Sequence, residues 1–120
     1  MTTTETGRNE KGAGESVRVR VDPGICGFEC AIEAGKEGRT VRLSIQSDCE
    51  QIKKLASLLG PVSLKDLFVP LSKNIIFLSA ETSRCHLACP VPWALVKAAE
   101  VALELALPKE ATLRFLNTKS

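Results

Sequence analysis

The chain has 120 residues, 44% of them hydrophobic, which is enough for one domain with its own core and too little for two. Its 16 basic and 14 acidic residues give a formal net charge of +2, which does not indicate the dense basic surface of nucleic-acid-binding proteins. No apolar run approaches the roughly 20 residues that cross a bilayer, and the polar N-terminus has no signal-peptide pattern. Composition therefore predicts one cytoplasmic domain, with neither nucleic acid nor a membrane as its partner.

The N-terminal residues differ in composition from the rest of the chain. Residues 1–16 are polar, with Met1 and Ala13 as the only apolar side chains, and they predict a disordered arm. From residue 17 onward, strict alternation of apolar and polar residues predicts three strands of an antiparallel meander. The apolar positions are Val17, Val19 and Val21, then Phe28, Cys30, Ile32 and Ala34, then Val41, Leu43 and Ile45. We expect a single compact α+β domain over residues 17–120.

Two main helices are expected to pack against the meander. The first begins at Ser47 or Asp48, because Ser47 and Glu50 have the spacing of a capping box, and it ends at Gly60-Pro61. The second begins near Pro90, which suits a first helical turn, and continues to about Leu107. Apolar residues surround most of this second helix, so it is predicted to be central, with Trp93 in the core.

The remaining segments carry weaker patterns. Leu64, Leu67, Phe68 and Leu71 have helical spacing, and residues 74–79 form an apolar run typical of a buried strand. Residues 112–116 alternate, which predicts a C-terminal strand.

Five cysteines are the feature that a folded core does not explain by itself. In a reducing compartment they are expected to be free thiols, ligands or a reactive centre rather than disulfides. Cys26 lies in a glycine-containing turn, Cys49 in the first turn of a helix, and Cys85 and Cys89 just before the second helix. The helix starts are expected to stabilise the thiolates of Cys49 and Cys89. If both helices pack on one face of the sheet, their N-termini meet near the turn that holds Cys26.

This placement favours a metal-binding domain. Soft anionic sulfurs suit zinc or an iron–sulfur cluster, and the candidate ligands are Cys26, Cys49, Cys85 and Cys89, with His86 as a further ligand. The Cys26-x3-Cys30 spacing is diagnostic of neither centre. Cys30 shares its strand face with Ile32 and is assigned to core packing.

Two alternatives remain open at this point. In a thiol redox or cysteine-nucleophile protein, Cys89 would attack, Cys85 would resolve and His86 would act as the base. In a plain interaction domain the cysteines would be structural and the partner an unidentified protein or a second copy of the chain. Phosphate-binding glycine loops, paired catalytic carboxylates and hydrolase elbows are missing from the sequence, which argues against those enzyme classes.

Three strings of the sequence carry a resemblance to a known family. They are Asp22-Pro-Gly-Ile-Cys26-Gly-Phe28, Ser47-Asp-Cys49-Glu50 and Cys85-His86-Leu-Ala-Cys89-Pro90-Val-Pro92. With these strings, the chain resembles a family of small, cysteine-containing bacterial and archaeal proteins of unknown function over about residues 17–116. The resemblance implies a self-standing domain and assigns no activity or cofactor.

Overall fold

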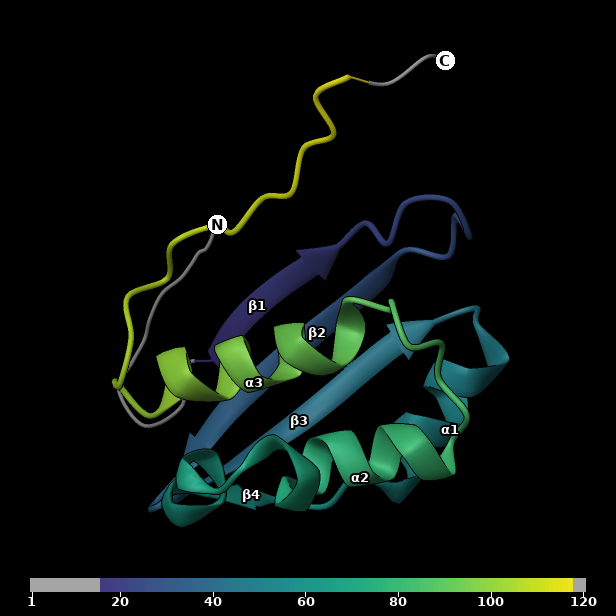
Figure 1. Ribbon diagram of the computed structural model, residues 1–120. Coiled ribbons are helices and arrows are strands. Elements are labelled where there is room, and N and C mark those ends of the chain that lie inside the picture. The colour runs from purple at the N-terminus through teal and green to yellow at the C-terminus, as the bar shows by residue number, and fades with distance from the viewer. Residues whose placement is uncertain (1–15, 118–120) are drawn as a thin grey trace.

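A four-stranded antiparallel sheet forms one layer of the molecule (Figure 1). The computed structural model describes residues 16–117, so the arm expected at 1–16 lies outside the described residues except for Ser16. The strands are β1 (Ser16–Val21), β2 (Cys30–Glu37), β3 (Thr40–Ser47) and β4 (Val62–Ser63), and they are ordered β1-β2-β3-β4. The meander of β1, β2 and β3 is therefore confirmed, as is the α+β class.

The alternating residues give this sheet one buried and one exposed face. The strand register aligns Val19 with Ile32 and Ile32 with Ile45, so apolar side chains form rows across the strands. Neighbouring polar residues such as Arg18 and Glu33 face solvent. Because the buried sheet residues belong to one core cluster together with helical residues, the helices cover only this face.

The second layer holds, within residues 16–117, the α-helices α1 (Glu50–Leu58), α2 (Ile75–Thr82) and α3 (Val91–Ala102). Helix α3 packs across β1 and β2, α1 packs against β3, and α2 contacts both of these helices. Helix α3 is central as predicted, and its buried residues include Ala94, Ala98, Ala99 and Ala102. The assignment of Trp93 to the core is wrong, because this side chain is 43% exposed. None of the described helices has the length and apolar character that a membrane crossing requires.

The segment between α1 and α3 differs most from the prediction. Residues 64–73 contain two 3₁₀ helices, η2 (Leu64–Phe68) and η3 (Leu71–Lys73). The run at 74–79 forms the start of α2 and not a strand. The reason is Asn74, whose Oδ1 accepts hydrogen bonds from the amides of Ile76 (2.9 Å) and Phe77 (3.4 Å). Its Nδ2 donates to the carbonyl of Asp66 (2.9 Å), so this buried N-cap also ties α2 to η2.

Helix α3 ends at Ala102, well before the predicted Leu107. Glu104 adopts a φ of 63°, and the amides of Glu104 and Leu105 donate to the carbonyls of Val101 (3.0 Å) and Glu100 (2.8 Å). This bonding pattern is a Schellman motif, which terminates a helix. The strand predicted at residues 112–116 is wrong, since this segment is irregular and exposed.

Candidate functional site

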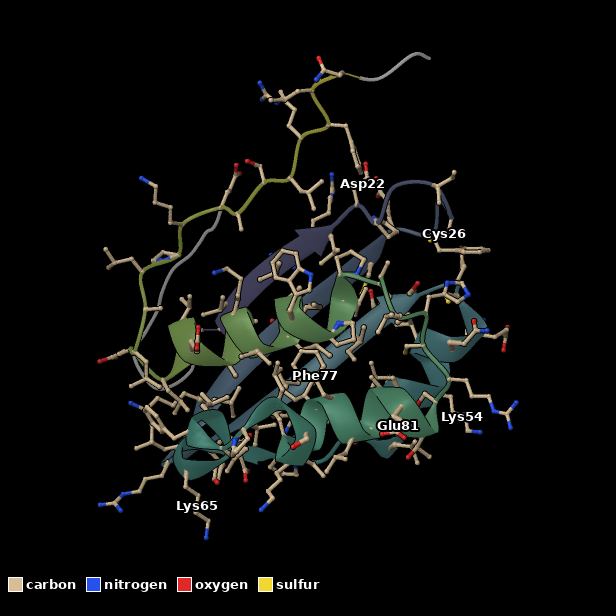
Figure 2. The ribbon with its side chains drawn as sticks, in the orientation of Figure 1. Asp22, Cys26, Lys54, Lys65, Phe77 and Glu81 are labelled. Atoms are coloured by element: carbon tan, nitrogen blue, oxygen red, sulfur yellow. The ribbon has the colours of Figure 1, made fainter. Side chains whose placement is uncertain are left out.

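The connections that carry cysteines gather at one end of the molecule. The last rung of the meander pairs Val21 with Cys30 and Cys30 with Ser47. The β1–β2 loop, the β3–α1 connection and the α2–α3 loop all lie at this end, beside the start of α3 (Figure 1). Figure 2 shows Cys26 here and Lys65 at the opposite end. The antiparallel meander and the direction of α3 thus bring distant parts of the sequence together.

The β1–β2 loop holds Cys26 at the surface. Asp22 Oδ1 accepts from the amide of Gly24 (3.1 Å), and the amide of Gly27 donates to the carbonyl of Gly24 (3.0 Å). Gly24 and Gly27 have φ values of +95° and +75°, which other residues rarely adopt, so the turn requires both glycines. The loop exposes Cys26 and its neighbour Ile25 to solvent.

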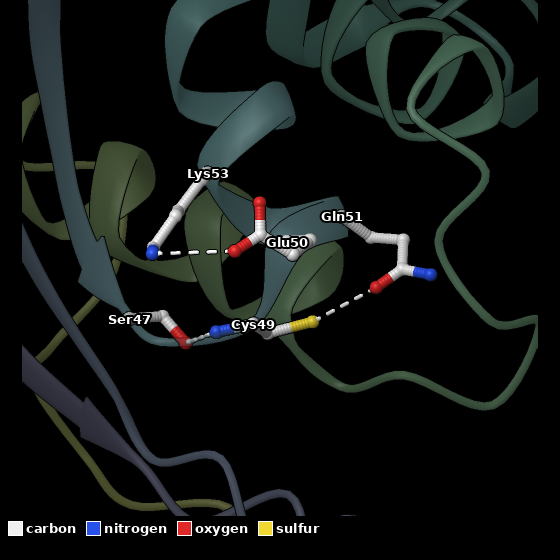
Figure 3. A network of polar contacts seen from close by, with 5 residues as sticks. All are labelled: Ser47, Cys49, Glu50, Gln51 and Lys53. Carbon is white, nitrogen blue, oxygen red and sulfur yellow. Dashed lines mark hydrogen bonds and ion pairs between the residues drawn. The ribbon is translucent and has the colours of Figure 1, made fainter.

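Cys49 is the N-cap residue of α1, and its side chain packs against the core. Figure 3 shows its polar contacts. Its thiol donates to Gln51 Oε1 (3.3 Å), and its amide donates to Ser47 Oγ (3.2 Å). The predicted capping box between Ser47 and Glu50 does not form, because Cys49 is the N-cap and Glu50 is the first residue of the helix. Glu50 pairs with Lys53 instead (3.4 Å). Ser47 therefore orients Cys49 rather than capping the helix.

Cys85 and Cys89 are positioned by the end of α2. Arg84 has a φ of 61°, its amide donates to the carbonyl of Glu81 (3.0 Å), and the amide of Cys85 donates to the carbonyl of Ala80 (3.0 Å). This second Schellman motif directs Cys85 against the core.

A short turn follows, in which the amide of Cys89 donates to the carbonyl of His86 (3.1 Å). Cys89 is half-buried and packs on the core, whereas His86 and Leu87 are exposed. The turn therefore separates two half-buried thiols by an exposed imidazole.

Burial and mutual repulsion keep these thiols protonated. The pKa of Cys85 is raised from 9.0 to about 11, mainly by burial and to a smaller extent by negative charge on Cys89 and Cys49. Burial also raises the pKa of Cys89, the amide of Val91 partly opposes this, and the charges of Cys49 and Cys26 add to the increase. The expectation that the helix start favours the Cys89 thiolate is therefore wrong, because desolvation outweighs the amide.

Cys30 belongs to this electrostatic group as well as to the core. It is 2% exposed, which confirms its assignment to core packing. Its pKa is raised to about 11, mainly by burial and to a smaller extent by negative charge on Cys89 and Cys49. The electrostatic link between Cys30 and the other cysteines was not predicted, although Cys30 pairs with Ser47, two residues before Cys49. Gln51, the partner of the Cys49 thiol, was also missed.

The thiols are grouped but do not form a preassembled ligand set. All five cysteines are free. Within residues 16–117, no three His, Cys, Asp or Glu side chains are placed to hold a metal ion together. Cys26 and His86 are exposed, while Cys49, Cys85 and Cys89 are half-buried. A shared ligand would therefore require the two loops to move toward Cys49.

Comparison with known proteins gives one match. Residues 17–115 match a family of unknown function designated DUF6951. The chain belongs to this family. Membership confirms the resemblance drawn from the cysteine strings and its extent along the chain, but it does not bear on a bacterial or archaeal origin. No curated protein and no solved structure matches the chain.

Proposed function

We propose that this DUF6951 domain binds a soft, thiolate-ligated metal centre, zinc or an iron–sulfur cluster, through Cys26, Cys49, Cys85 and Cys89. The observation that carries the proposal is that the three connections holding Cys26, Cys49, Cys85 and Cys89 lie at one end of the molecule, where β2 begins with Cys30. A core explains buried Cys30, but it gives no reason for an exposed cysteine in a glycine turn beside three half-buried ones.

The electrostatics of the clustered cysteines favour binding of a cation. Each thiol that ionises makes ionisation of its neighbours harder, as the mutual influence of Cys49, Cys85 and Cys89 indicates. A divalent metal or a cluster would neutralise these charges together and offset the cost of burying them. Each cysteine that becomes a ligand would release one proton to solvent, so binding in neutral buffer would be accompanied by proton release.

The two loops provide the freedom that assembly needs. Cys26 lies in an exposed turn with glycines at positive φ, and the amide hydrogen bond between Cys89 and His86 closes a short exposed turn. Cys49 would have to give up its hydrogen bond to Gln51, which only the protonated thiol can donate. His86, exposed beside Cys85, is the additional candidate ligand. We therefore place ligand binding and loop ordering in one step.

The thiol-nucleophile alternative receives less support. An attacking cysteine needs a thiolate at neutral pH, and Cys89 and Cys85 both have a raised pKa. No interaction of Cys89 with His86 as a base is present among the described hydrogen bonds; their contact is between backbone atoms.

The test is the metal and acid-labile sulfide content of the full chain, purified without oxygen and without chelator. Iron with sulfide and broad visible absorption would identify a cluster, and stoichiometric zinc would identify a zinc site. Calorimetric titration of metal-free protein with zinc, in two buffers of different ionisation enthalpy, measures the protons released.

Matched variants separate ligands from packing residues. Cys85→Ser and Cys89→Ser should lose the metal while keeping the native far-ultraviolet circular dichroism. Cys30→Ala should retain the metal, because this residue is assigned to the core. Metal content that is absent in the parent, or unchanged in both serine variants, would refute the proposal.

A further inference from the structure

The outer edge of β1 is unpaired in the part of the chain that the structure describes. β1 is the first strand of the order β1-β2-β3-β4, and among the described strands it pairs with β2 alone. Backbone groups at such an edge can accept another strand, and natural proteins usually cover or block them. β1 contains no proline, and its six residues form a regular ladder with β2.

The segment that follows α3 exposes large apolar side chains. It leaves the body of the molecule after the Schellman motif and Pro108, on the side of β1 (Figure 1). Leu113, Phe115 and Leu116 are 80%, 75% and 77% exposed. Three large and mostly exposed apolar side chains in five residues are unusual on the surface of an isolated protein.

The segment and the edge match in length and pattern. Residues 112–116 are five residues long against six in β1, and they alternate so that Leu113 and Phe115 share one face of a strand. On β1, Val17 and Val19 belong to the core face but are only half-buried, and none of the described strands lies beyond them. Leu113 and Phe115 on a neighbouring strand would cover these two valines.

The direction of the chain decides between the molecule's own β1 and that of another copy. Helix α3 runs antiparallel to β1, so the C-terminal segment leaves the helix near the start of β1 (Figure 1). If this segment paired with β1 of its own chain, the two strands would be parallel. Every pair in this sheet is antiparallel, and antiparallel pairing is the more stable arrangement per residue. In a dimer with a twofold axis, the C-terminal segment of each copy can pair antiparallel with β1 of the other copy.

We propose that residues 112–116 form a fifth strand on the β1 edge of a second copy of this chain, with the exchange being reciprocal. The interface lies on the β1 edge and involves none of the cysteines. Dimer formation therefore does not depend on metal binding.

The test is the molecular mass of the full chain by sedimentation equilibrium over a range of concentrations, with three point variants. Leu113→Glu and Phe115→Glu should raise the dimer dissociation constant on the order of 100-fold, because each variant removes a buried apolar contact from both copies. Leu107→Glu is the matched control: Leu107 is 84% exposed, but it precedes Pro108 and lies outside the pairing segment. This control should leave the dissociation constant within about threefold of the parent.

Amide hydrogen exchange locates the contact. Exchange of β1 amides should slow as the protein concentration rises in the parent and in Leu107→Glu, but not in Phe115→Glu. A chain that stays monomeric up to millimolar concentration would overturn the proposal, and so would β1 protection that does not depend on concentration, since this indicates pairing within one chain. Equal weakening by Leu107→Glu would also overturn it, because the association would then be nonspecific.

Discussion

The Cys30 thiol is the most deeply buried of the five cysteines, and its burial has a consequence for stability. The unfolded chain loses this proton near pH 9.0, whereas the folded chain keeps it until about pH 11. The free energy of unfolding therefore falls as the pH rises between these values, by at most about 2 to 3 kcal/mol for this group. Urea unfolding of metal-free, reduced protein at several pH values from 8 to 11 measures the loss.

Cys30→Ala provides the comparison. At pH 8 it should lower the free energy of unfolding by about 1 kcal/mol, for the lost packing. Above pH 9 its stability should fall less steeply than that of the parent, and the remaining slope should come from Cys85 and Cys89. Parallel curves for the two proteins would show that Cys30 ionises normally in the folded state.

The thiols should also differ in reactivity. Cys26 is exposed, whereas Cys85 is half-buried with a pKa near 11. With iodoacetamide at pH 7.5, peptide mass spectrometry should find Cys26 modified first. The rate at Cys85 should increase about tenfold per pH unit up to pH 10, because only the thiolate reacts.

Protein unfolded in urea provides the control for this experiment, since all five cysteines should then react at similar rates. Equal rates at Cys26 and Cys85 in the folded protein would contradict the assigned environments.

At the scale of elements, Asn74 determines that α2 is a helix. Its side chain makes three hydrogen bonds while it is buried, so Asn74→Ala should lower the free energy of unfolding by about 2 kcal/mol. Asn74→Ser keeps a cap acceptor but loses the donor to Asp66, and it should cost about half as much. Thermal and urea unfolding measure both effects. If the two variants were equally destabilised, the N-cap contribution would be negligible.

The meander was predictable from sequence because each strand has one buried face, and alternation alone identifies it. Helix α2 was not, because the apolar run after Asn74 has no clear period, and the cap that decides its conformation depends on the distant Asp66. The end of α3 was missed for a related reason. Glu104 occupies a left-handed position usually held by glycine, so the usual stop signal is lacking.

The positions of the candidate ligands in the fold were predictable, but their electrostatics were not. The positions of Cys26, Cys49, Cys85 and Cys89 near element ends follow from turn and cap residues in the sequence. The pKa of Cys89 does not, because it depends on how deeply α3 and its neighbours bury the thiol. The role of Ser47 was misassigned because Ser47 and Glu50 have the spacing of a capping box, while the actual bonds are to Cys49 and Lys53.

At the scale of the whole molecule, a metal shared by three connections should stabilise the folded state as one unit. Zinc at about 100 times its dissociation constant should raise the free energy of unfolding by about 2.7 kcal/mol. The rise in melting temperature measures this stabilisation by zinc. It is recorded by calorimetry in a reducing buffer that contains no metal other than the added zinc. The increase should be greater at pH 8 than at pH 6.5, because binding displaces protons.

Cys85→Ser is the variant that tests this coupling, and Cys30→Ala is its control. Zinc should leave the melting temperature of the first variant nearly unchanged and should stabilise the second about as much as the parent. If zinc stabilised Cys85→Ser as strongly as the parent protein, it would be bound elsewhere.

The alanines of α3 restrict where this domain can change over evolutionary time. Ala94, Ala98, Ala99 and Ala102 are among the residues that let the helix backbone lie close to the strands, and a larger side chain at any of them would separate the two layers. A closely packed layer of this kind does not open gradually into a cavity for a substrate. New specificities in relatives of this chain should therefore arise by variation in the loops and the C-terminal segment, while the layer between helix and sheet stays constant.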